Sequence, residues 1–288
     1  MGATMVERLA SSLLYEGYAL YPYTPEATKN ATPTPFGIVY PPAYSARQPA
    51  TYDHLQIECV ALETEPEATE VVAEVLFLQA TGARHKAAER RVRIEGTLAE
   101  LAEAGATESF AFEPASELGV STGPDPDAAG EVLTGNLRVS VELLDSGLAR
   151  ISSRIENTTS LPEGELGGMD RAAALRRSLL STHTMLTVSH GRFASPLENE
   201  GEVGEAVQAC DNVNSWPVLA DADDAAVLGA AILPPDHPQI SEQSQTNMFD
   251  NTEIEEALTL HVKTLSEEER AEIERQDPTV REMIERVE

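Results

Sequence analysis

The sequence predicts a mainly β protein of the α+β class: an antiparallel β-sandwich with N-terminal and C-terminal helices and one inserted helix. Apolar and polar residues alternate in many short runs, most strictly from Leu137 to Leu143, as they do in half-buried strands. Turn-rich stretches such as ETEPEATE and STGPDPDAAGE separate these runs. Helical spacing is found mainly at the two ends and over residues 170–182. Short strands joined by turns are typical of a sandwich.

A chain of 288 residues, of which 41% are hydrophobic, is long enough for one large β domain or two smaller ones. We expect a single β-rich domain over residues 1–288, in which residues 266–288 form a C-terminal helical extension. The alternative is a division into two lobes, formed by the strands before and after the inserted helix.

The N-terminal region is predicted to be a helix followed by an irregular segment. In VERLASSLL, apolar residues recur at helical spacing, and Gly17 is expected to end the helix. Residues 21–44 are rich in proline and tyrosine, which indicates extended, irregular chain. Four tyrosines of this region either line a binding surface or bury their rings and bond through their hydroxyls; they are Tyr18, Tyr21, Tyr23 and Tyr40.

Two hairpins are predicted in the middle of the chain. HLQIECVALE and VVAEVLFLQA are expected to pair across ETEPEATE, and residues 137–143 are expected to pair with ARISSRIE across Asp145-Ser-Gly. Between the hairpins, RRVRIEGTL and SFAFEP read as strands. TLAELAEAG reads as a short helix that stops at Gly105.

The inserted helix is predicted over DRAAALRRSLLSTH, with Asp170 as its N-cap and Ala174, Leu175 and Leu179 facing inward. A strand, TMLTVSHGRF, follows it. Residues 198–206 are expected to form an acidic loop.

The C-terminal third is predicted to contain two strands and a helical end. The strands are expected at 225–233 and 257–265, on either side of a long polar loop. Ser266-Glu-Glu-Glu269 is a capping box that opens a helix, and Asp277-Pro278 restarts it.

The chain is strongly acidic: 49 acidic and 20 basic residues give a net charge of −29. Such a surface repels nucleic acid and anionic membranes, so neither is an expected partner. Only three of the basic residues are lysines: Lys29, Lys86 and Lys263. This composition favours a protein adapted to high salt, where ions screen the self-repulsion of the acidic shell. The alternative is an ordinary acidic protein.

No apolar run of eighteen residues is present, so we expect no membrane insertion. Glu7 interrupts the region where an export signal needs apolar residues, which favours a cytoplasmic protein. A disulfide between Cys59 and Cys210 is disfavoured in a reducing compartment. The N-glycosylation motifs at Asn30 and Asn157 do not predict a glycan, because they are used only in secreted proteins.

Support for catalysis or metal binding is weak. His183 and His190 are separated by an odd number of residues, which puts them on opposite faces of a strand. A metal site built from Cys210, His190 and His237 would depend on folding alone, since no ligand spacing supports it, and the alternative is structural histidines.

No phosphate-binding, dinucleotide-binding or zinc-protease motif occurs, and we predict no cofactor and no catalytic residue. Asp221-Ala-Asp223-Asp224 lacks the glycine and final glutamate of a calcium loop, which indicates a solvated acidic turn. Cys210 precedes Asp211, whose charge raises a thiol pKa.

The loop from Pro234 to Glu256 is the best candidate for a recognition surface. It is too long for a tight turn, and Pro234, Pro235 and Pro238 limit its freedom. Trp216 is expected to anchor the core or its rim. The predicted partner-binding residues are Tyr18, Tyr21, Tyr23, Trp216, His237, Gln239, Met248, Phe249 and Asp250.

Several blocks together resemble a family: EGYALYPYTPEATKN with FGIVYP, ARISSRIENTT, SLLSTHTMLTVSHGRFASP, NVNSWPVL, and ILPPDHPQI followed by MFDNTEIEEALTLHVKTLSEEER. They are similar to accessory proteins of unassigned role encoded beside nickel–iron uptake hydrogenases in some bacteria and archaea. The resemblance spans nearly the whole chain, and this copy departs from the pattern in its acidity.

The resemblance implies a non-enzymatic accessory protein for hydrogenase assembly, maturation or scaffolding, with hydrogenase subunits or other accessory proteins as partners. Two alternatives stay open. One is a maturation enzyme that handles a metal or cofactor through Cys210 and nearby histidines. The other is a sandwich-domain binding protein with no link to hydrogenase.

Adaptation to salt predicts that the melting temperature rises steeply between low salt and molar KCl, because ions screen the repulsion within the acidic shell. Thermal unfolding followed by circular dichroism across a KCl series measures this. A melting temperature that is the same in low and molar KCl contradicts the expectation.

Overall fold

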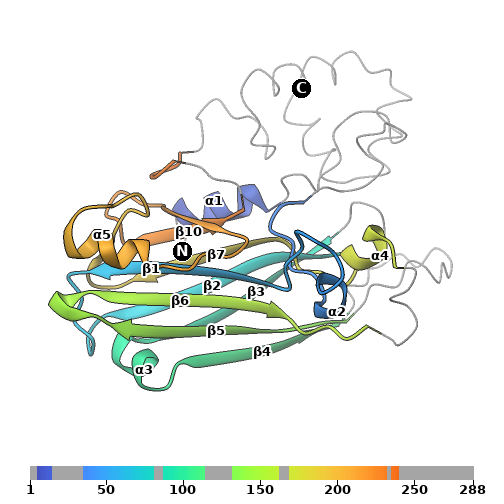
Figure 1. The fold of residues 1–288 in the computed structure, drawn as a ribbon, viewed down its shortest axis with the longest axis horizontal. Helices are drawn as coiled ribbons and strands as arrows, with labels where there is room; N and C mark the ends of the chain where they lie inside the picture. The colour runs from blue at the N-terminus through green and yellow to red at the C-terminus, as the bar shows by residue number, and fades with distance from the viewer. Residues whose placement is uncertain are drawn as a thin grey trace, which may run out of the picture.

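The predicted β-sandwich is confirmed: in a computed structural model, two antiparallel sheets of five strands pack face to face (Figure 1). The structure describes residues 5–14, 35–80, 87–113, 132–161, 169–231 and 235–239. In spatial order, the first sheet consists of β4 (Ala106–Phe112), β5 (Leu133–Leu143), β6 (Ala149–Asn157), β1 (His54–Leu62) and β8 (Arg192–Phe193). The second consists of β3 (Ala87–Thr97), β2 (Glu70–Ala80), β7 (Leu180–Val188), β10 (Ala226–Ala230) and β9 (Trp216–Leu219).

Alternation along the strands builds the core between the sheets. In β5, Leu137, Val139 and Val141 are buried, whereas Arg138 and Ser140 are exposed, as the sequence predicts. The inward-facing side chains of both sheets form one apolar cluster. Strand β7 follows the inserted helix but pairs with β2, which precedes it. Strands from both sides of that helix therefore share one sheet.

The outer face of the second sheet carries another apolar layer. The predicted N-terminal helix is present as α1 (Met5–Leu13), and its residues Val6 and Leu9 pack in one cluster with Leu76 of β2 and Leu228 of β10. Arg91 bonds to Glu74 beside this helix, with 2.8 Å between Nη1 and Oε1. The central strands of this sheet are thus buried on both faces, which explains their near-continuous apolar sequence.

The open side of the sandwich, where β3 and β4 lie, is closed by aromatic rings and one arginine. Phe77, Phe110 and Phe112 contact one another with ring centroids 5.3–5.9 Å apart. The Arg90 guanidinium stacks 4.9 Å from the Phe112 centroid and donates from Nε to Gln79 Oε1 at 2.8 Å. A charged side chain that points inward from an edge strand discourages pairing with another chain.

The predicted hairpin between β1 and β2 is wrong. Strand β1 pairs with β6 and β8, whereas β2 pairs with β3 and β7 in the other sheet. Alternation shows which face of a strand is buried, but not which strand lies beside it. The acidic connection between them therefore crosses from one sheet to the other.

The second predicted hairpin is confirmed, because β5 and β6 pair along their length. They are joined by a 3-10 turn at Asp145–Gly147. Ser146 and Gly147 have positive φ angles of 60° and 74°, the conformation that a tight turn demands. The helix predicted after β3 is also confirmed as α3 (Leu98–Glu103), with a capping box formed by Thr97 and Glu100.

The inserted helix is much shorter than predicted. It is α4 (Arg171–Leu175), capped by Asp170 as expected, and β7 already begins at Leu180. Ser181 has a φ of 51° at a β-bulge opposite β2. The extra residue reverses the alternation of the strand. Before the bulge, Leu179 faces the core between the sheets and Leu180 faces the outer apolar layer. Apolar residues next to a bulge imitate helical spacing, which explains the error.

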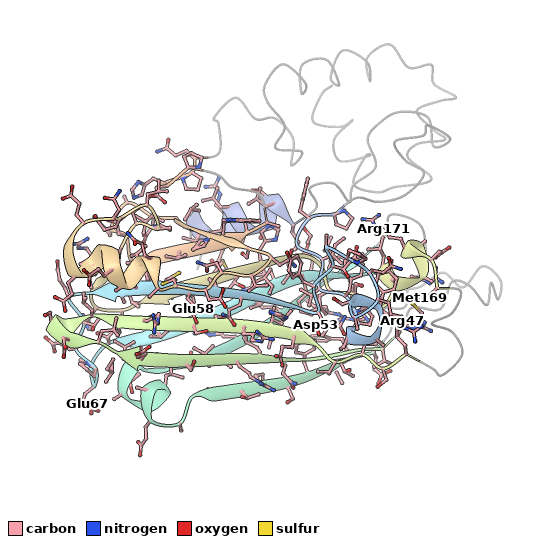
Figure 2. All side chains as sticks on the ribbon, viewed as in Figure 1. Arg47, Asp53, Glu58, Glu67, Met169 and Arg171 are labelled. Carbon is pink, nitrogen blue, oxygen red and sulfur yellow. The ribbon has the colours of Figure 1, made fainter. Side chains whose placement is uncertain are left out.

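The acidic loop predicted at 198–206 is wrong as well, because this region forms α5 (Gly201–Gln208). Val203 and Val207 pack against Val60 and Leu62 on the outer face of the first sheet. A short helix, α2 (Pro42–Ser45), likewise interrupts the segment predicted to be irregular. Figure 2 places Arg47, Met169 and Arg171 at the end of the molecule where α2 and α4 lie.

In the C-terminal third, the strand predicted at 225–233 is present as β10 but ends at Ala230. The strand predicted at 257–265 and the helical extension at 266–288 lie outside the described residues. Gly17 also lies outside them. Among the helices that the structure describes, none has the length and hydropathy required to cross a membrane.

A buried amide joins the first sheet to the chain that leads into the second. Asn157 ends β6 with 1% of its surface exposed. Its Nδ2 donates to Val39 O and to Arg177 O, both at 2.9 Å, and its Oδ1 accepts from Thr159 N at 2.9 Å. Every polar atom of the amide is therefore occupied. The nitrogen that glycosylation would modify is enclosed in the folded protein.

We expect Asn157→Asp to destabilise the fold by about 3 kcal/mol, because a carboxylate oxygen would face two carbonyl oxygens in a buried site. Urea unfolding at fixed salt measures the change. The control is Asn136→Asp on the half-exposed part of β5, where we expect a change within about 0.5 kcal/mol. Equal effects of the two substitutions would contradict the role of Asn157.

Candidate functional site

The start of the predicted recognition loop is fastened to the edge of the second sheet. Asp236 accepts two hydrogen bonds, at Oδ1 from Leu219 N (3.0 Å) and at Oδ2 from Ser195 Oγ (2.6 Å). His237 N donates to Leu219 O at 2.7 Å, and His237 Nε2 lies 2.7 Å from Asp224 Oδ1. We call these contacts of Asp236 and His237 the Asp236 clasp.

The Asp236 clasp lies at the outer edge of β9, which within the described part of the chain pairs only with β10. Both polar backbone atoms of Leu219 bond to the loop. Pro217, two residues earlier and so on the same side of the strand, has no N–H to offer. Covering an edge in this way prevents it from pairing with another strand.

The acidic turn between β9 and β10 supports the clasp. Asp221 Oδ1 accepts from Ala226 N at 3.0 Å, which fixes the turn, and Asp224 has a φ of 56°. The hydrogen bond to Asp224 raises the pKa of His237 above its ordinary value, and the charges of Asp236 and Asp221 add to this. The imidazole thus lies among three carboxylates, which favour its protonated form.

Ser195, Asp236 and His237 have the residue types of a hydrolase triad but not its geometry. In a triad the histidine must accept the serine proton. Here the Ser195 hydroxyl donates to Asp236, whereas His237 bonds to Asp224. A carboxylate acceptor leaves the hydroxyl without a suitable base, so these contacts position the loop.

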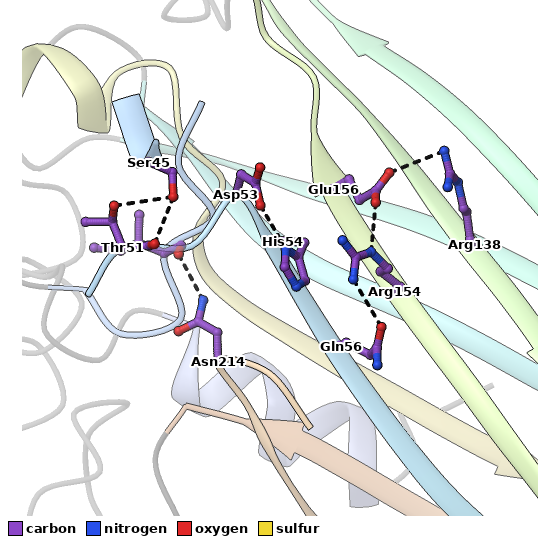
Figure 3. A network of polar contacts seen from close by, with 10 residues as sticks. Ser45, Thr51, Asp53, His54, Gln56, Arg138, Arg154, Glu156 and Asn214 are labelled. Atoms are coloured by element: carbon purple, nitrogen blue, oxygen red, sulfur yellow. Dashed lines mark hydrogen bonds and ion pairs between the residues drawn. The ribbon is translucent and has the colours of Figure 1, made fainter. Parts of the chain in front are cut away.

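Trp216 begins β9 and lies on the rim, with 51% of its surface exposed. Phe36, also exposed at 46%, belongs to a segment that runs beside it, because Asn214 Nδ2 donates to Ile38 O at 3.0 Å (Figure 3). Gln239 is exposed at the end of the described part of the loop. The rim therefore presents two exposed aromatic rings, and Trp216 starts the strand whose other end, Leu219, bears the Asp236 clasp.

The other predicted contact residues divide into two groups. Tyr40 is buried and stacks on Tyr44 with ring centroids 5.2 Å apart, so its ring belongs to the core rather than to a binding surface. The remaining predicted residues lie outside the described part of the chain: Tyr18, Tyr21, Tyr23, Met248, Phe249 and Asp250.

The structure does not bring the candidate metal ligands together. Within the described ranges, no group of three or more His, Cys, Asp or Glu side chains is arranged to hold a metal ion. Cys210 follows α5, His190 is exposed beyond the end of β7, and His237 belongs to the Asp236 clasp.

The Cys210 thiol is unsuited to nucleophilic chemistry. Burial raises its pKa to about 11, with a further contribution from the charge of Glu58, while Arg150 acts in the opposite direction. The thiol therefore stays protonated at neutral pH, and the thiolate is the reactive form. Cys59 and Cys210 are both free, so no disulfide joins them.

A row of polar side chains on the outer face of the first sheet was not predicted. Arg154 donates from Nε to Glu156 Oε1 at 2.7 Å and from Nη1 to Gln56 Oε1 at 3.3 Å, and Arg138 lies 3.4 Å from Glu156 (Figure 3). The alternation of β5 and β6 indicates that these positions face outward, but their mutual pairing depends on strand register. The charges compensate one another, which favours a supporting role.

No protein-family model matches the chain, and no curated protein matches it significantly.

The buried environment of His183 was also not predicted from the sequence. It is 1% exposed on β7, and its Nδ1 lies 2.6 Å from Ser181 O. Burial lowers its pKa to about 4, and the hydrogen bond to Ser181 opposes this shift. The imidazole is thus neutral in the folded protein throughout the physiological range.

This burial predicts a stability that falls as the pH drops from about 6.5 to about 4. In that window the unfolded chain binds a proton that the folded imidazole does not, so the loss attributable to His183 reaches about 3 kcal/mol. Urea unfolding of the wild type and of His183→Gln at pH 7 and pH 5 measures the difference. The control is His190→Gln, which removes an exposed imidazole. Its free energy of unfolding should depend on pH as that of the wild type does. An NMR titration of His183 with a midpoint near 6.5 would contradict the expectation.

Proposed function

We propose that this chain is a non-enzymatic accessory protein that assists the assembly, maturation or scaffolding of a nickel–iron hydrogenase through protein–protein contacts. The link to hydrogenase rests on the resemblance of the sequence blocks. Two of those blocks, NVNSWPVL and ILPPDHPQI, contribute Trp216 and the Asp236 clasp.

The observation that carries a binding role is the exposed rim beside the clasp. Asp236 and His237 fix where the loop leaves the sheet, so the described start of the loop is held in one place before any partner arrives. Pre-ordering of this kind lowers the entropy cost of association. Trp216 offers a large, half-exposed ring on the strand to which the loop is attached, and tryptophan is enriched among residues that dominate binding energy.

The environments of Cys210 and Ser195 also favour binding over nucleophilic chemistry. The thiol is held protonated by burial, and the hydroxyl is held by a carboxylate. Neither contacts a histidine that could act as its base in the described part of the chain.

The proposal predicts that a tagged copy, expressed in its natural host and purified under native salt, recovers hydrogenase subunits or their accessory proteins. Recovery is measured by mass spectrometry against an untagged strain. Recovery of none of these proteins would overturn the proposal.

Trp216→Ala is expected to weaken the captured complex by roughly tenfold or more, because truncation of a central tryptophan removes a large contact. Asp236→Asn tests the Asp236 clasp in the same assay. The matched control is Leu143→Ala, which truncates a similarly exposed apolar side chain on β5 of the other sheet. Equal losses with Trp216→Ala and Leu143→Ala would show that the rim is not the contact surface.

A further inference from the structure

The interior of the sandwich contains hydroxyl groups that bond to no other group of the protein. Thr184 of β7, Ser153 of β6 and Ser215 before β9 are each 1% exposed, and their hydroxyl oxygens have no hydrogen-bond partner. Thr182 of β7 is in the same condition. Native proteins rarely leave buried hydroxyls unpaired, because the lost hydration is not compensated.

Three of these hydroxyls belong to residues that lie beside a single contact between the two sheets. Ser153 is the cross-strand neighbour of Ile57, and Thr184 is the cross-strand neighbour of Gly229. Ile57 and Gly229 meet across the sandwich: a Cβ on Gly229 would lie 2.7 Å from Ile57 Cγ2 and 3.1 Å from Ser215 Oγ. The hydroxyls thus come from three separate elements that lie beside the contact between Ile57 and Gly229.

Their orientation is set by strand alternation. Ser153 has the same parity as Ile151 and Ile155, and Thr184 the same parity as Leu186, all of which belong to the core between the sheets. The cross-strand neighbours of Ser153 are Ile57 and Val139, and Val75 is a neighbour of Thr184, so the adjacent strands supply no polar side chain. The group that satisfies these hydroxyls must be small and neutral, and must both donate and accept hydrogen bonds.

We propose that ordered water molecules occupy the interior between Ser153, Thr184 and Ser215 and join the two sheets by hydrogen bonds. A buried water makes about three hydrogen bonds to otherwise unsatisfied groups, which is the number of hydroxyls beside this contact. Thr182, two residues along β7, extends the polar surface for a second water. An ion is disfavoured, because the buried carboxylate of the described residues, Glu74, is paired with Arg91.

The water site gives Gly229 a specific role. The missing side chain lets Ile57 approach from the opposite sheet and leaves the Ser215 hydroxyl facing the interior. The absence of a Cβ at Gly229 therefore allows the arrangement of the interior hydroxyls. This arrangement is independent of the proposed contact with hydrogenase.

Magnetic relaxation dispersion of water oxygen-17 counts long-lived internal waters and tests the proposal directly. The Thr184→Val variant keeps the side-chain shape and removes the hydroxyl, so we expect it to lose at least one long-lived water relative to the wild type. The control is Ser178→Ala, whose buried hydroxyl already donates to Ala174 O at 2.7 Å; its water count should equal that of the wild type. An unchanged count in Thr184→Val would overturn the proposal.

A high-resolution crystal structure of the wild type provides a test that needs no variant. Ordered water within about 3 Å of Thr184 Oγ1 and Ser215 Oγ is the expected result. Hydroxyls that instead bond to neighbouring backbone carbonyls, with no water between them, would overturn it.

Discussion

The position of the two sheets relative to each other depends on the amide of Asn157. It lies at the end of β6, where it binds the segment around Val39 and the segment at Arg177 that leads into β7 of the second sheet. Val39 is itself joined to Leu179 by two backbone hydrogen bonds, so the amide binds two segments that are already held together. Three hydrogen bonds from one fully enclosed side chain set an alignment that apolar packing alone leaves free to slide, because the hydrophobic effect has no direction.

Directional contacts of the same kind recur wherever an edge of the sandwich would otherwise be open. Arg90 closes the side next to β4, and the Asp236 clasp covers β9. The free edge of β1 is bonded to Val213 through both backbone atoms of Gln56. These contacts leave side chains, rather than unpaired backbone, as the groups through which these edges can meet a partner. Trp216 is the most prominent aromatic among them.

The sequence predicts faces of strands better than it predicts neighbours. The strict alternation from Leu137 to Val141 indicates a half-buried strand whatever lies beside it, and β5 is found there. The partner of β1 depends on contacts a hundred residues away, which local pattern does not encode. Helix α5 escaped prediction because Gly201 and Gly204 have low helix propensity, and its stability comes from packing on Val60 and Leu62.

The candidate site was predictable to a similar extent. The composition of the loop after Pro234 and the single tryptophan indicated the correct part of the chain. The bond between Asp236 and Ser195 joins positions 41 residues apart, and it arises only when β8 and β9 come together. The buried state of His183 likewise depends on a bulge and on the helix packed over its sheet.

The crossing of the chain between sheets after β1 has a consequence for how the protein is synthesised. Leu55 pairs with Ile155, and Val75 with Thr184, so β1 emerges from the ribosome long before β6, and β2, which can pair early with β3, emerges long before β7. At 5–20 residues per second, roughly 5–20 s pass before those partners are made. During that interval apolar strands are exposed, and a dense shell of negative charge on the nascent chain provides the repulsion that keeps neighbouring copies apart.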